Sequence, residues 1–307
     1  MAGTSAHPLE LWLPALQRFD PAHPLQRLLA RADRFEDGPQ GYLEGLGGFF
    51  RCDVQPLPAA ALTRELARGD AADALWLSAD PAWVQPEMNG ARLLASGRLG
   101  LSEEEAEALA APLRPLFGDA GMQLELTTPD RWHLRLSPGS PLPPFAAPEQ
   151  ALGEHLLQHL PHGPGGRRWR LLLTEAQVLL HQHPLNAERR ARGQPPVNSL
   201  WLWGGGRLPH RVGSTLAGVV GDDPLLCALA AHAGLPQQAR DLAQLAQTPV
   251  GWLVDLQDLT AADIERDAWP AIEARRRRDA LRFHFASGER YLHRPWHRWR
   301  AWRGGRA

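Results

Sequence analysis

The chain has 307 residues, of which 44% are hydrophobic and 22% charged, and its formal net charge is −1. This length is sufficient for a large buried core, in one elaborate domain or in two packed lobes, and we expect two lobes. The near-zero charge excludes a general attraction to nucleic acid or anionic membranes, so such a partner would need a local basic patch. The chain contains no lysine, which excludes a P-loop lysine, a Schiff-base lysine and a lysine general base.

The cysteines and the apolar segments indicate a cytoplasmic protein. Cys52 and Cys227 lie far apart in unlike contexts, which favours reduced, buried thiols over a disulfide framework. No stretch has the length needed to span a bilayer, and the N-terminus lacks a positive region before an apolar run. We therefore expect a cytoplasmic location and no membrane partner.

The first half of the chain alternates strand-like and helix-like segments. The pattern predicts a strand over 9–16, a helix over 25–34, a helix over 59–68, a strand over 74–78 stopped by Pro81, a helix over 102–117, and a hairpin formed by 124–128 and 132–136. Gly69 is the expected C-cap of the second helix. The clearest local signal is the capping box Ser102-Glu103-Glu104-Glu105, which predicts a helix start.

The segment 138–148 is rich in Pro, Ser and Gly and predicts a linker between an N-terminal α/β lobe over 1–137 and a C-terminal α/β lobe over 149–307. Beyond it we expect helices over 150–160, 174–183, 224–233, 240–246 and 270–282, and strands over 199–203, 250–254, 283–285 and 290–293. Ser287-Gly288 predicts a hairpin turn. The alternation predicts an α/β fold with a mixed, mostly parallel sheet flanked by helices, and a smaller α+β lobe.

The segment 179–207, LLHQHPLNAERRARGQPPVNSLWLWGGGR, carries the candidate ligand-binding residues. Glycines after a strand present backbone amides to an anion, and arginine makes forked contacts with carboxylate or phosphate. These features predict an anionic small molecule bound by His183, Asn186, Arg189, Arg190, Asn198, Gly204, Gly205 and Gly206. The alternatives are a tight turn that lets Trp201 and Trp203 pack, and a solvated helix face.

Acidic residues after the strand over 250–254 are the candidates for a metal site. Asp255 and Asp258, with His181, would supply ligands for a divalent metal at the end of a sheet. Helix capping and loop solvation are the alternatives for the aspartates, and His181 and His183 show no known metal-ligand spacing. We favour a chain without a cofactor.

The C-terminal segment from Arg275 to Arg306 is rich in arginine, with Trp296, Trp299 and Trp302 three residues apart. Basic groups beside stacking aromatics suit single-stranded nucleic acid. On a helix, however, this spacing gives a tryptophan stripe, which usually docks onto its own domain. We favour docking over nucleic-acid binding, and the sequence predicts no particular protein partner.

Several runs carry a family resemblance. GGFFRCD, WLSADPAWVQP, LSEEEAEAL, PDRWHLRL and HPLNAERRARGQPPVNSLWLWGGG resemble the proteobacterial RpfE-type regulatory proteins, which are labelled phosphoglycerate mutase-like. More distantly, His183-Pro184, Asn186, Arg189, Gly193, Asn198 and the Trp-Gly run resemble the archaeal-type cofactor-independent phosphoglycerate mutases of the alkaline phosphatase superfamily.

That distant resemblance implies a two-metal phosphoryl-transfer site with Asp and His ligands and a Ser nucleophile. The chain departs from this pattern, because LWLPALQRFD has no Asp-Gly motif and VDLQDL, residues 254–259, has no histidine. We therefore expect a non-catalytic regulatory or ligand-binding relative. The alternatives are a metal-dependent mutase- or phosphatase-type phosphotransferase with an altered site, and single-stranded nucleic-acid binding through the C-terminal segment.

Overall fold

The computed structural model describes residues 7–88 and 90–300, and the chain divides into two compact units. Unit 1 combines the chain up to Cys52 with the chain from Arg211 onward, and unit 2 is the continuous segment 53–210. This division differs from the predicted one, because the segment 138–148 lies inside unit 2. Leu142 and Phe145 pack against the core of that unit, so this extended, proline-rich segment covers a domain instead of joining two.

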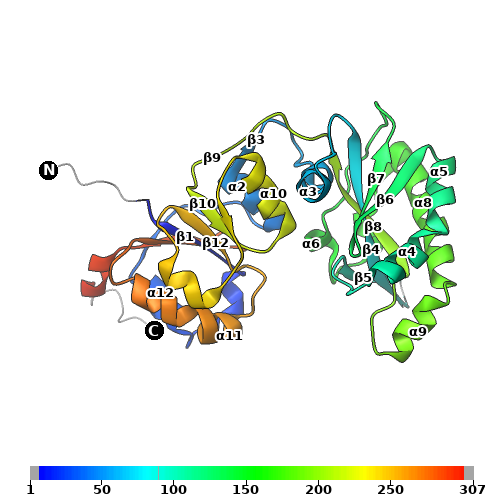
Figure 1. The fold of residues 1–307 in the computed structure, drawn as a ribbon. Coiled ribbons are helices and arrows are strands. Elements are labelled where there is room, and N and C mark those ends of the chain that lie inside the picture. Colours follow the sequence, from blue (N-terminus) through cyan, green and yellow to red (C-terminus); the bar gives the residue numbers. More distant parts are fainter. Residues whose placement is uncertain (1–6, 89, 301–307) are drawn as a thin grey trace. The chain divides into compact units, whose positions relative to one another are not determined.

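Unit 1 is built on a seven-stranded sheet with the order β11-β10-β12-β1-β13-β14-β2 (Figure 1). Neighbours from β11 to β13 are parallel, whereas β14 pairs antiparallel with both β13 and β2. The strands are β1 (Leu9–Leu13), β2 (Asp33–Arg34), β10 (Gly218–Val220), β11 (Gln237–Gln238), β12 (Trp252–Asp255), β13 (Leu281–Phe285) and β14 (Arg290–His293). The predicted mixed, mostly parallel sheet and the C-terminal hairpin are therefore confirmed.

The central strand β1 sends alternate side chains to opposite faces of this sheet, as a pleated strand must. Leu9, Leu11 and Leu13 join the core that contains side chains of α1 and α12. On the other face, Trp12 stacks on Tyr42 of α2 with ring centroids 5.2 Å apart. Helices α11 and α12 thus cover one face, and α2 and α10 cover the other (Figure 1).

The remaining elements of unit 1 are short. The α-helices are α1 (Pro24–Leu29), α2 (Tyr42–Phe49), α10 (Pro224–His232), α11 (Ala261–Asp263) and α12 (Trp269–Arg275). The 3-10 turns are η1 (Leu16–Arg18), η2 (Leu242–Gln247) and η4 (Pro295–Trp299), the π-helical turn is η3 (Ile264–Ala268), and β3 (Phe50–Cys52) pairs antiparallel with β9 (Val212–Ser214).

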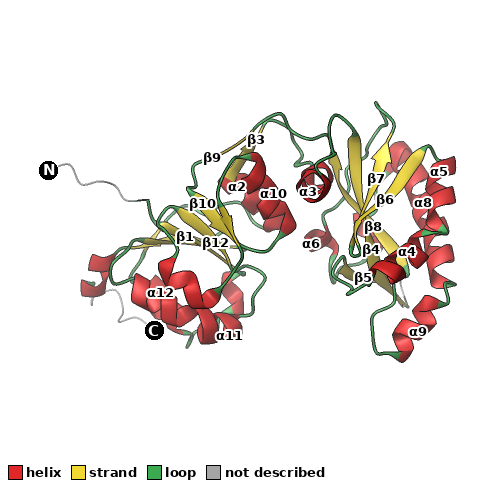
Figure 2. Ribbon diagram, in the orientation of Figure 1, coloured by secondary structure: helices red, strands yellow, loops and turns green. Residues whose placement is uncertain are grey.

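Unit 2 is an α+β unit with a five-stranded antiparallel sheet, in which β4 pairs with β5, β7 and β8, and β7 pairs with β6 (Figure 2). The strands are β4 (Leu75–Glu87), β5 (Gly90–Ser96), β6 (Met122–Thr128), β7 (Arg131–Leu136) and β8 (Ser199–Gly206). The helices are α3 (Ala59–Arg68), α4 (Glu103–Ala110), α5 (Leu113–Asp119), α6 (Pro148–Ala151), α7 (Leu156–His159), α8 (Gly163–His181) and α9 (Leu185–Ala191).

The main core of unit 2 lies between its sheet and the helices α4, α5 and α8. Leu77 and Ala79 of β4 point into this core, where they meet Phe117 of α5 and Trp169 of α8. The neighbouring residue Trp76 joins a smaller cluster with alanines of α3. The period-two alternation of β4 therefore places helices on both faces of the sheet.

Three local predictions in unit 2 are corrected by the structure. Strand β4 continues through Pro81, which pairs with Leu200 of β8 and whose carbonyl oxygen accepts a hydrogen bond from the Gly97 amide at 2.9 Å. The helix expected over 102–117 is divided at Pro112 into α4 and α5, although its capping box at Ser102 is confirmed. The segment 184–198, for which no helix or strand was predicted, contains the helix α9.

No helix in the described part of the chain is both long enough and apolar enough to cross a bilayer.

Candidate functional site

Two of the predicted ligand-binding residues, Asn186 and Arg189, are buried in unit 2 and are bonded within it. The Asn186 amide nitrogen donates to the carbonyl oxygens of Leu180 and Val197, each at 2.7 Å, and its oxygen accepts from the Val197 amide. Asn186 therefore joins the end of α8 to the chain entering β8. This is the bond pattern of a structural asparagine whose donors and acceptor are all in use.

Arg189 of α9 is 0% exposed and spreads its guanidinium over three partners. It donates to the Pro195 carbonyl at 2.9 Å and to the Leu99 carbonyl at 2.7 Å, and it forms an ion pair with Glu105 of α4 at 2.5 Å. Glu105 also contacts Arg192. A charged group buried this deeply is stable only with such a complete set of partners.

The other predicted polar residues have smaller roles in the fold. Asn198 extends the pairing of the chain before β8 with β4, because its side chain accepts from the Val84 amide at 2.8 Å and donates to the Val84 carbonyl at 2.7 Å. The His183 Nδ1 atom accepts from the Leu185 amide at 3.3 Å, at the start of α9. Arg190 is exposed, so it alone of the two neighbouring arginines faces solvent. The prediction of an anionic ligand at this segment therefore depends mainly on Arg190.

The three glycines of β8 allow close packing with α3 and with the segment 138–148. Gly204 has φ +63°, and a Cβ atom there would lie 2.7 Å from the Ala59 Cβ. A Cβ on Gly206 would lie 2.6 Å from Pro58, and one on Gly205 would lie 2.8 Å from Leu142. The register of β4 and β8 shifts at this point, as at a β-bulge. The glycines thus sit against protein atoms.

The predicted metal ligands are divided between the two units. His181 ends α8 in unit 2, whereas Asp255 and Asp258 belong to unit 1. Within residues 7–88 and 90–300, no three His, Cys, Asp or Glu side chains gather in an arrangement that would hold a metal ion.

An acidic edge nevertheless forms in unit 1 where the parallel strands β10 and β12 end. It consists of Asp222, Asp223, Asp255 and Asp258, which we call the acidic edge. The carboxyl ends of parallel strands are the usual place for a binding site in α/β proteins, because loops from neighbouring strands meet there. Asp223 caps α10 by accepting from the Leu225 amide at 2.8 Å, and its carboxylate also accepts a hydrogen bond from the Tyr42 hydroxyl.

Arg240 provides the cation of the acidic edge. Its guanidinium donates to the Asp255 carbonyl at 3.0 Å and to both carboxylate oxygens of Asp258, and it lies 3.7 Å from an Asp222 oxygen. The Arg240 backbone amide also donates to Asp222 at 3.0 Å. The sequence patterns did not single out Arg240, because the residue lies between β11 and η2, far along the chain from Asp258.

Burial changes the protonation of two groups at the acidic edge. Asp255 is 1% exposed. Its burial, together with the neighbouring Asp223 and Asp258 charges, raises the pKa of its carboxyl to about 7. Burial, together with Asp223, Asp222 and Asp255, raises the pKa of the Cys227 thiol. A thiol of raised pKa stays protonated at neutral pH and is a poor nucleophile.

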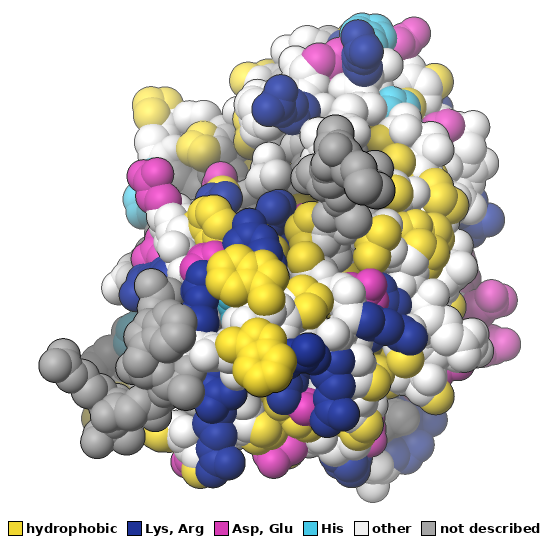
Figure 3. Space-filling model, turned by 90° about the vertical axis from the view of Figure 1, so that its left-hand side faces the viewer, with side chains coloured by type: hydrophobic (Ala, Val, Ile, Leu, Met, Phe, Trp, Pro, Cys, Tyr) yellow, Lys and Arg dark blue, Asp and Glu magenta, His cyan; other side chains and the backbone are white. Residues whose placement is uncertain are grey.

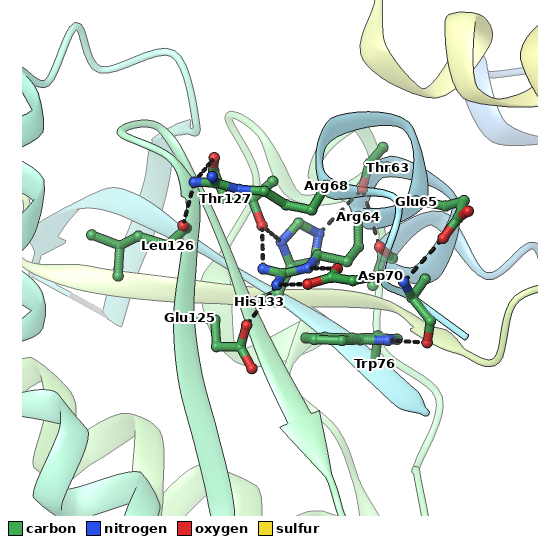
Figure 4. A network of polar contacts seen from close by, with 12 residues as sticks. Thr63, Arg64, Glu65, Arg68, Asp70, Trp76, Glu125, Leu126, Thr127 and His133 are labelled. Atoms are coloured by element: carbon green, nitrogen blue, oxygen red, sulfur yellow. Dashed lines mark hydrogen bonds and ion pairs between the residues drawn. The ribbon is translucent and has the colours of Figure 1, made fainter. Parts of the chain in front are cut away.

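A second polar cluster lies in unit 2 and was not foreseen from the sequence (Figure 4). His133 of β7 is 0% exposed, and its ring bridges Thr63 of α3 at 3.2 Å and Thr127 of β6 at 2.7 Å. The Thr63 hydroxyl donates to the Ala59 carbonyl, which leaves it to accept from the Nε2–H group of a neutral imidazole. Arg64 donates to the Thr127 hydroxyl, which is then free to donate to Nδ1. The cluster therefore fixes one neutral tautomer and ties α3 to the sheet.

Acid should destabilise unit 2 through His133. Burial, followed by the Arg131 and Arg64 charges, lowers the pKa of His133 to about 3, below the unfolded value of about 6.5. The unfolded chain therefore binds a proton that the folded chain refuses, and stability is lost as pH falls below the unfolded pKa. We expect His133 to cost roughly 2 kcal/mol at pH 5 relative to pH 7.

Urea unfolding of the wild type and of His133→Gln between pH 5 and 7 measures this contribution. The variant lacks the titrating ring, so the free-energy difference between the two proteins should shrink as pH falls. A constant difference over this range would show that His133 has an ordinary pKa.

Comparison with known proteins gives partial matches. No protein-family model matches the chain. One segment is 40% identical over 63 residues to the probable 2,3-bisphosphoglycerate-independent phosphoglycerate mutase of Geobacter sulfurreducens, covering 20% of this chain and 16% of that protein. A second match has 32% identity over 92 residues to the 2,3-bisphosphoglycerate-independent phosphoglycerate mutase of Methanothrix thermoacetophila, covering 28% of this chain and 24% of that protein. The matches thus span a quarter or less of each relative's length.

Two solved structures align with the chain at low similarity. The PH0037 protein from Pyrococcus horikoshii aligns with a TM-score of 0.47 and 12% identity, covering 94% of this chain and 87% of that one. The cofactor-independent phosphoglycerate mutase from Thermoplasma acidophilum aligns with a TM-score of 0.35 and 16% identity, covering 94% and 89%. The sequence matches make the chain weakly similar to cofactor-independent phosphoglycerate mutases over part of its length.

Proposed function

We propose that this chain is a non-catalytic relative of the phosphoglycerate mutases and acts in the cytoplasm as a regulatory or ligand-binding protein. The partial sequence similarity supports the kinship. We infer the loss of catalysis from the position of Arg240, whose guanidinium contacts Asp255, Asp258 and Asp222 of the acidic edge.

A guanidinium cannot replace a catalytic metal ion. Two-metal phosphoryl transfer needs carboxylates that coordinate the ions and open positions that accept substrate oxygens. Arg240 pairs with Asp258 and Asp222 and offers only N–H donors, so it cannot coordinate a substrate oxygen or lower the pKa of a bound water.

Activity assays test the proposal directly. We expect the purified protein with added Mn²⁺ or Zn²⁺ to leave 2- and 3-phosphoglycerate unconverted above the uncatalysed background. Conversion at enzymatic rates would overturn the proposal. The wild type should also melt at the same temperature with and without these ions, because its acidic edge already contains a cation.

Removal of Arg240 should expose the acidic edge to added cations. We expect Arg240→Ala to lower the free energy of unfolding by about 2 kcal/mol, because the charged hydrogen bonds are lost and the aspartates repel one another. Millimolar Mn²⁺ should restore part of the melting temperature of this variant and leave that of the wild type unchanged.

The matched control is Arg266→Ala, which removes an exposed arginine paired with Asp263 and Asp267 in the same unit. This variant should lose little stability and gain no response to Mn²⁺. If the melting temperatures of the wild type and Arg240→Ala responded equally to Mn²⁺, the Arg240 guanidinium would not occupy a position that a metal ion can take.

The competing candidate is a metal-dependent phosphotransferase with an altered site, in which Asp255 and Asp258 would be the carboxylate ligands. Metal analysis of protein purified without a histidine tag separates the two. Stoichiometric bound metal in the wild type would favour the phosphotransferase, whereas metal-free protein that is not stabilised by divalent ions supports the non-catalytic assignment.

A further inference from the structure

The C-terminal turn η4 of unit 1 presents two tryptophans to solvent. Trp296 is 51% exposed and Trp299 is 69% exposed, whereas Trp12, Trp76 and Trp132 are buried. The expectation that this stripe docks onto its own domain is therefore wrong for Trp296 and Trp299; Trp302 lies outside the described residues. Two adjacent exposed indoles of this size are unusual on a soluble surface unless a partner covers them.

An arginine accompanies each of these rings. The Arg298 guanidinium carbon lies 4.9 Å from the centroid of the Trp299 ring, and that of Arg300 lies 4.5 Å from the Trp296 ring. Figure 3 shows hydrophobic side chains surrounded by arginines on this side of the molecule. We define the Arg/Trp face as Trp296, Arg298, Trp299 and Arg300, with Arg294 beside them.

The carboxylates near the Arg/Trp face do not neutralise it. Asp33 pairs with both Arg294, at 2.8 Å, and Arg300, at 2.6 Å. Glu273 likewise pairs with both Arg276, at 2.5 Å, and Arg277, at 3.4 Å. Since each carboxylate meets two guanidiniums, the face keeps a positive charge even though the whole chain has a net charge of −1.

The same ion pairs hold the aromatic rings in place. Asp33 fixes the arginines on both sides of η4, and His297 within the turn is 0% exposed and contacts the Trp296 ring with centroids 4.2 Å apart. The indoles are thus presented by an anchored turn. A preorganised surface loses less conformational entropy when a partner binds.

We propose that the Arg/Trp face binds single-stranded nucleic acid. Indole rings stack on unpaired bases without regard to sequence, and the exposed Arg298 beside them meets the phosphates. A duplex fits less well, because its bases are already stacked on one another. This function is independent of the acidic edge and does not rest on the loss of mutase activity.

Fluorescence anisotropy with a labelled oligothymidylate of about 20 nucleotides and the full-length chain tests the proposal. We expect Trp296→Ala and Trp299→Ala each to weaken binding by about tenfold, whereas Trp296→Phe and Trp299→Phe keep most of it, since phenylalanine retains a stacking face. Binding of the wild type should fall by roughly tenfold between about 50 and 200 mM salt. Circular dichroism checks that these exposed substitutions leave the fold intact.

A pair of arginine variants separates local contact from total charge. Arg298→Ala and Arg266→Ala remove the same charge, but only the first lies on the Arg/Trp face, so only the first should weaken binding. Equal effects of the two variants, oligothymidylate binding unchanged by the alanine variants, or binding of heparin as tight as that of oligothymidylate would each overturn the proposal. So would light scattering that shows the two tryptophans holding a dimer together.

Discussion

Replacing Arg189 with alanine is expected to lower the free energy of unfolding by about 3 kcal/mol. The substitution removes the ion pair to Glu105 and leaves the Leu99 and Pro195 carbonyl oxygens without their donor in a buried position. Breaking a buried ion pair by removing one partner costs about 3 to 5 kcal/mol, and the remaining contact between Glu105 and Arg192 places this case at the lower end. Urea unfolding followed by circular dichroism measures the change.

The adjacent Arg190 is a matched control, since Arg190→Ala removes the same side chain from the same helix at an exposed position. We expect its free energy of unfolding to stay within about 0.5 kcal/mol of the wild type. This pair of variants separates a structural role from a ligand-binding role. If Arg189→Ala unfolded like the wild type, the buried bonds of Arg189 would not stabilise unit 2, and a ligand-binding role for it would regain support.

Gly204→Ala is expected to lower the free energy of unfolding by about 3 kcal/mol. One part is the left-handed backbone at φ +63°, which costs an alanine about 1 to 2 kcal/mol. The other part is packing, because the new Cβ would lie 2.7 Å from the Ala59 Cβ at the buried start of α3. Forcing such atoms apart costs about 1 to 3 kcal/mol.

Gly193→Ala isolates the backbone part of this effect. Gly193 has φ +71° after α9, and a Cβ there would meet no atom within 4 Å. We expect this variant to lose about 1 kcal/mol in the same urea experiment. Equal losses for the two variants would mean that the glycine run of β8 is not needed for close packing on α3.

The sequence predicted the fold best where a signal is local. The capping box at Ser102, the hairpin of β6 and β7 and the strand β1 depend on neighbouring residues, and the structure confirms them. The division into units was predicted differently, because it depends on β1 pairing with β12 and β13 from the other end of the chain. Side-chain alternation alone does not reveal such a distant partner.

The candidate site was less accessible to prediction for a related reason. Asn186 and Arg189 have the residue types of a ligand site, yet their partners, among them Leu99 and Glu105, are supplied by distant parts of unit 2. Arg240 was not singled out, because its role appears only when Asp258 and Asp222 converge on it. Residue type therefore indicated polar chemistry correctly but did not indicate whether the partner is a ligand or the protein.

Because β1 pairs with strands that come much later in the chain, it must wait for them during synthesis. Leu9–Leu13 leaves the ribosome before unit 2 does, but its neighbours Trp252–Asp255 and Leu281–Phe285 are made after unit 2. Unit 2, which is continuous in sequence, has all of its strands by Gly206 and can fold while β1 is still unpaired. The strand LELWL therefore remains without its sheet while unit 2 is made, and it needs protection from aggregation at that stage.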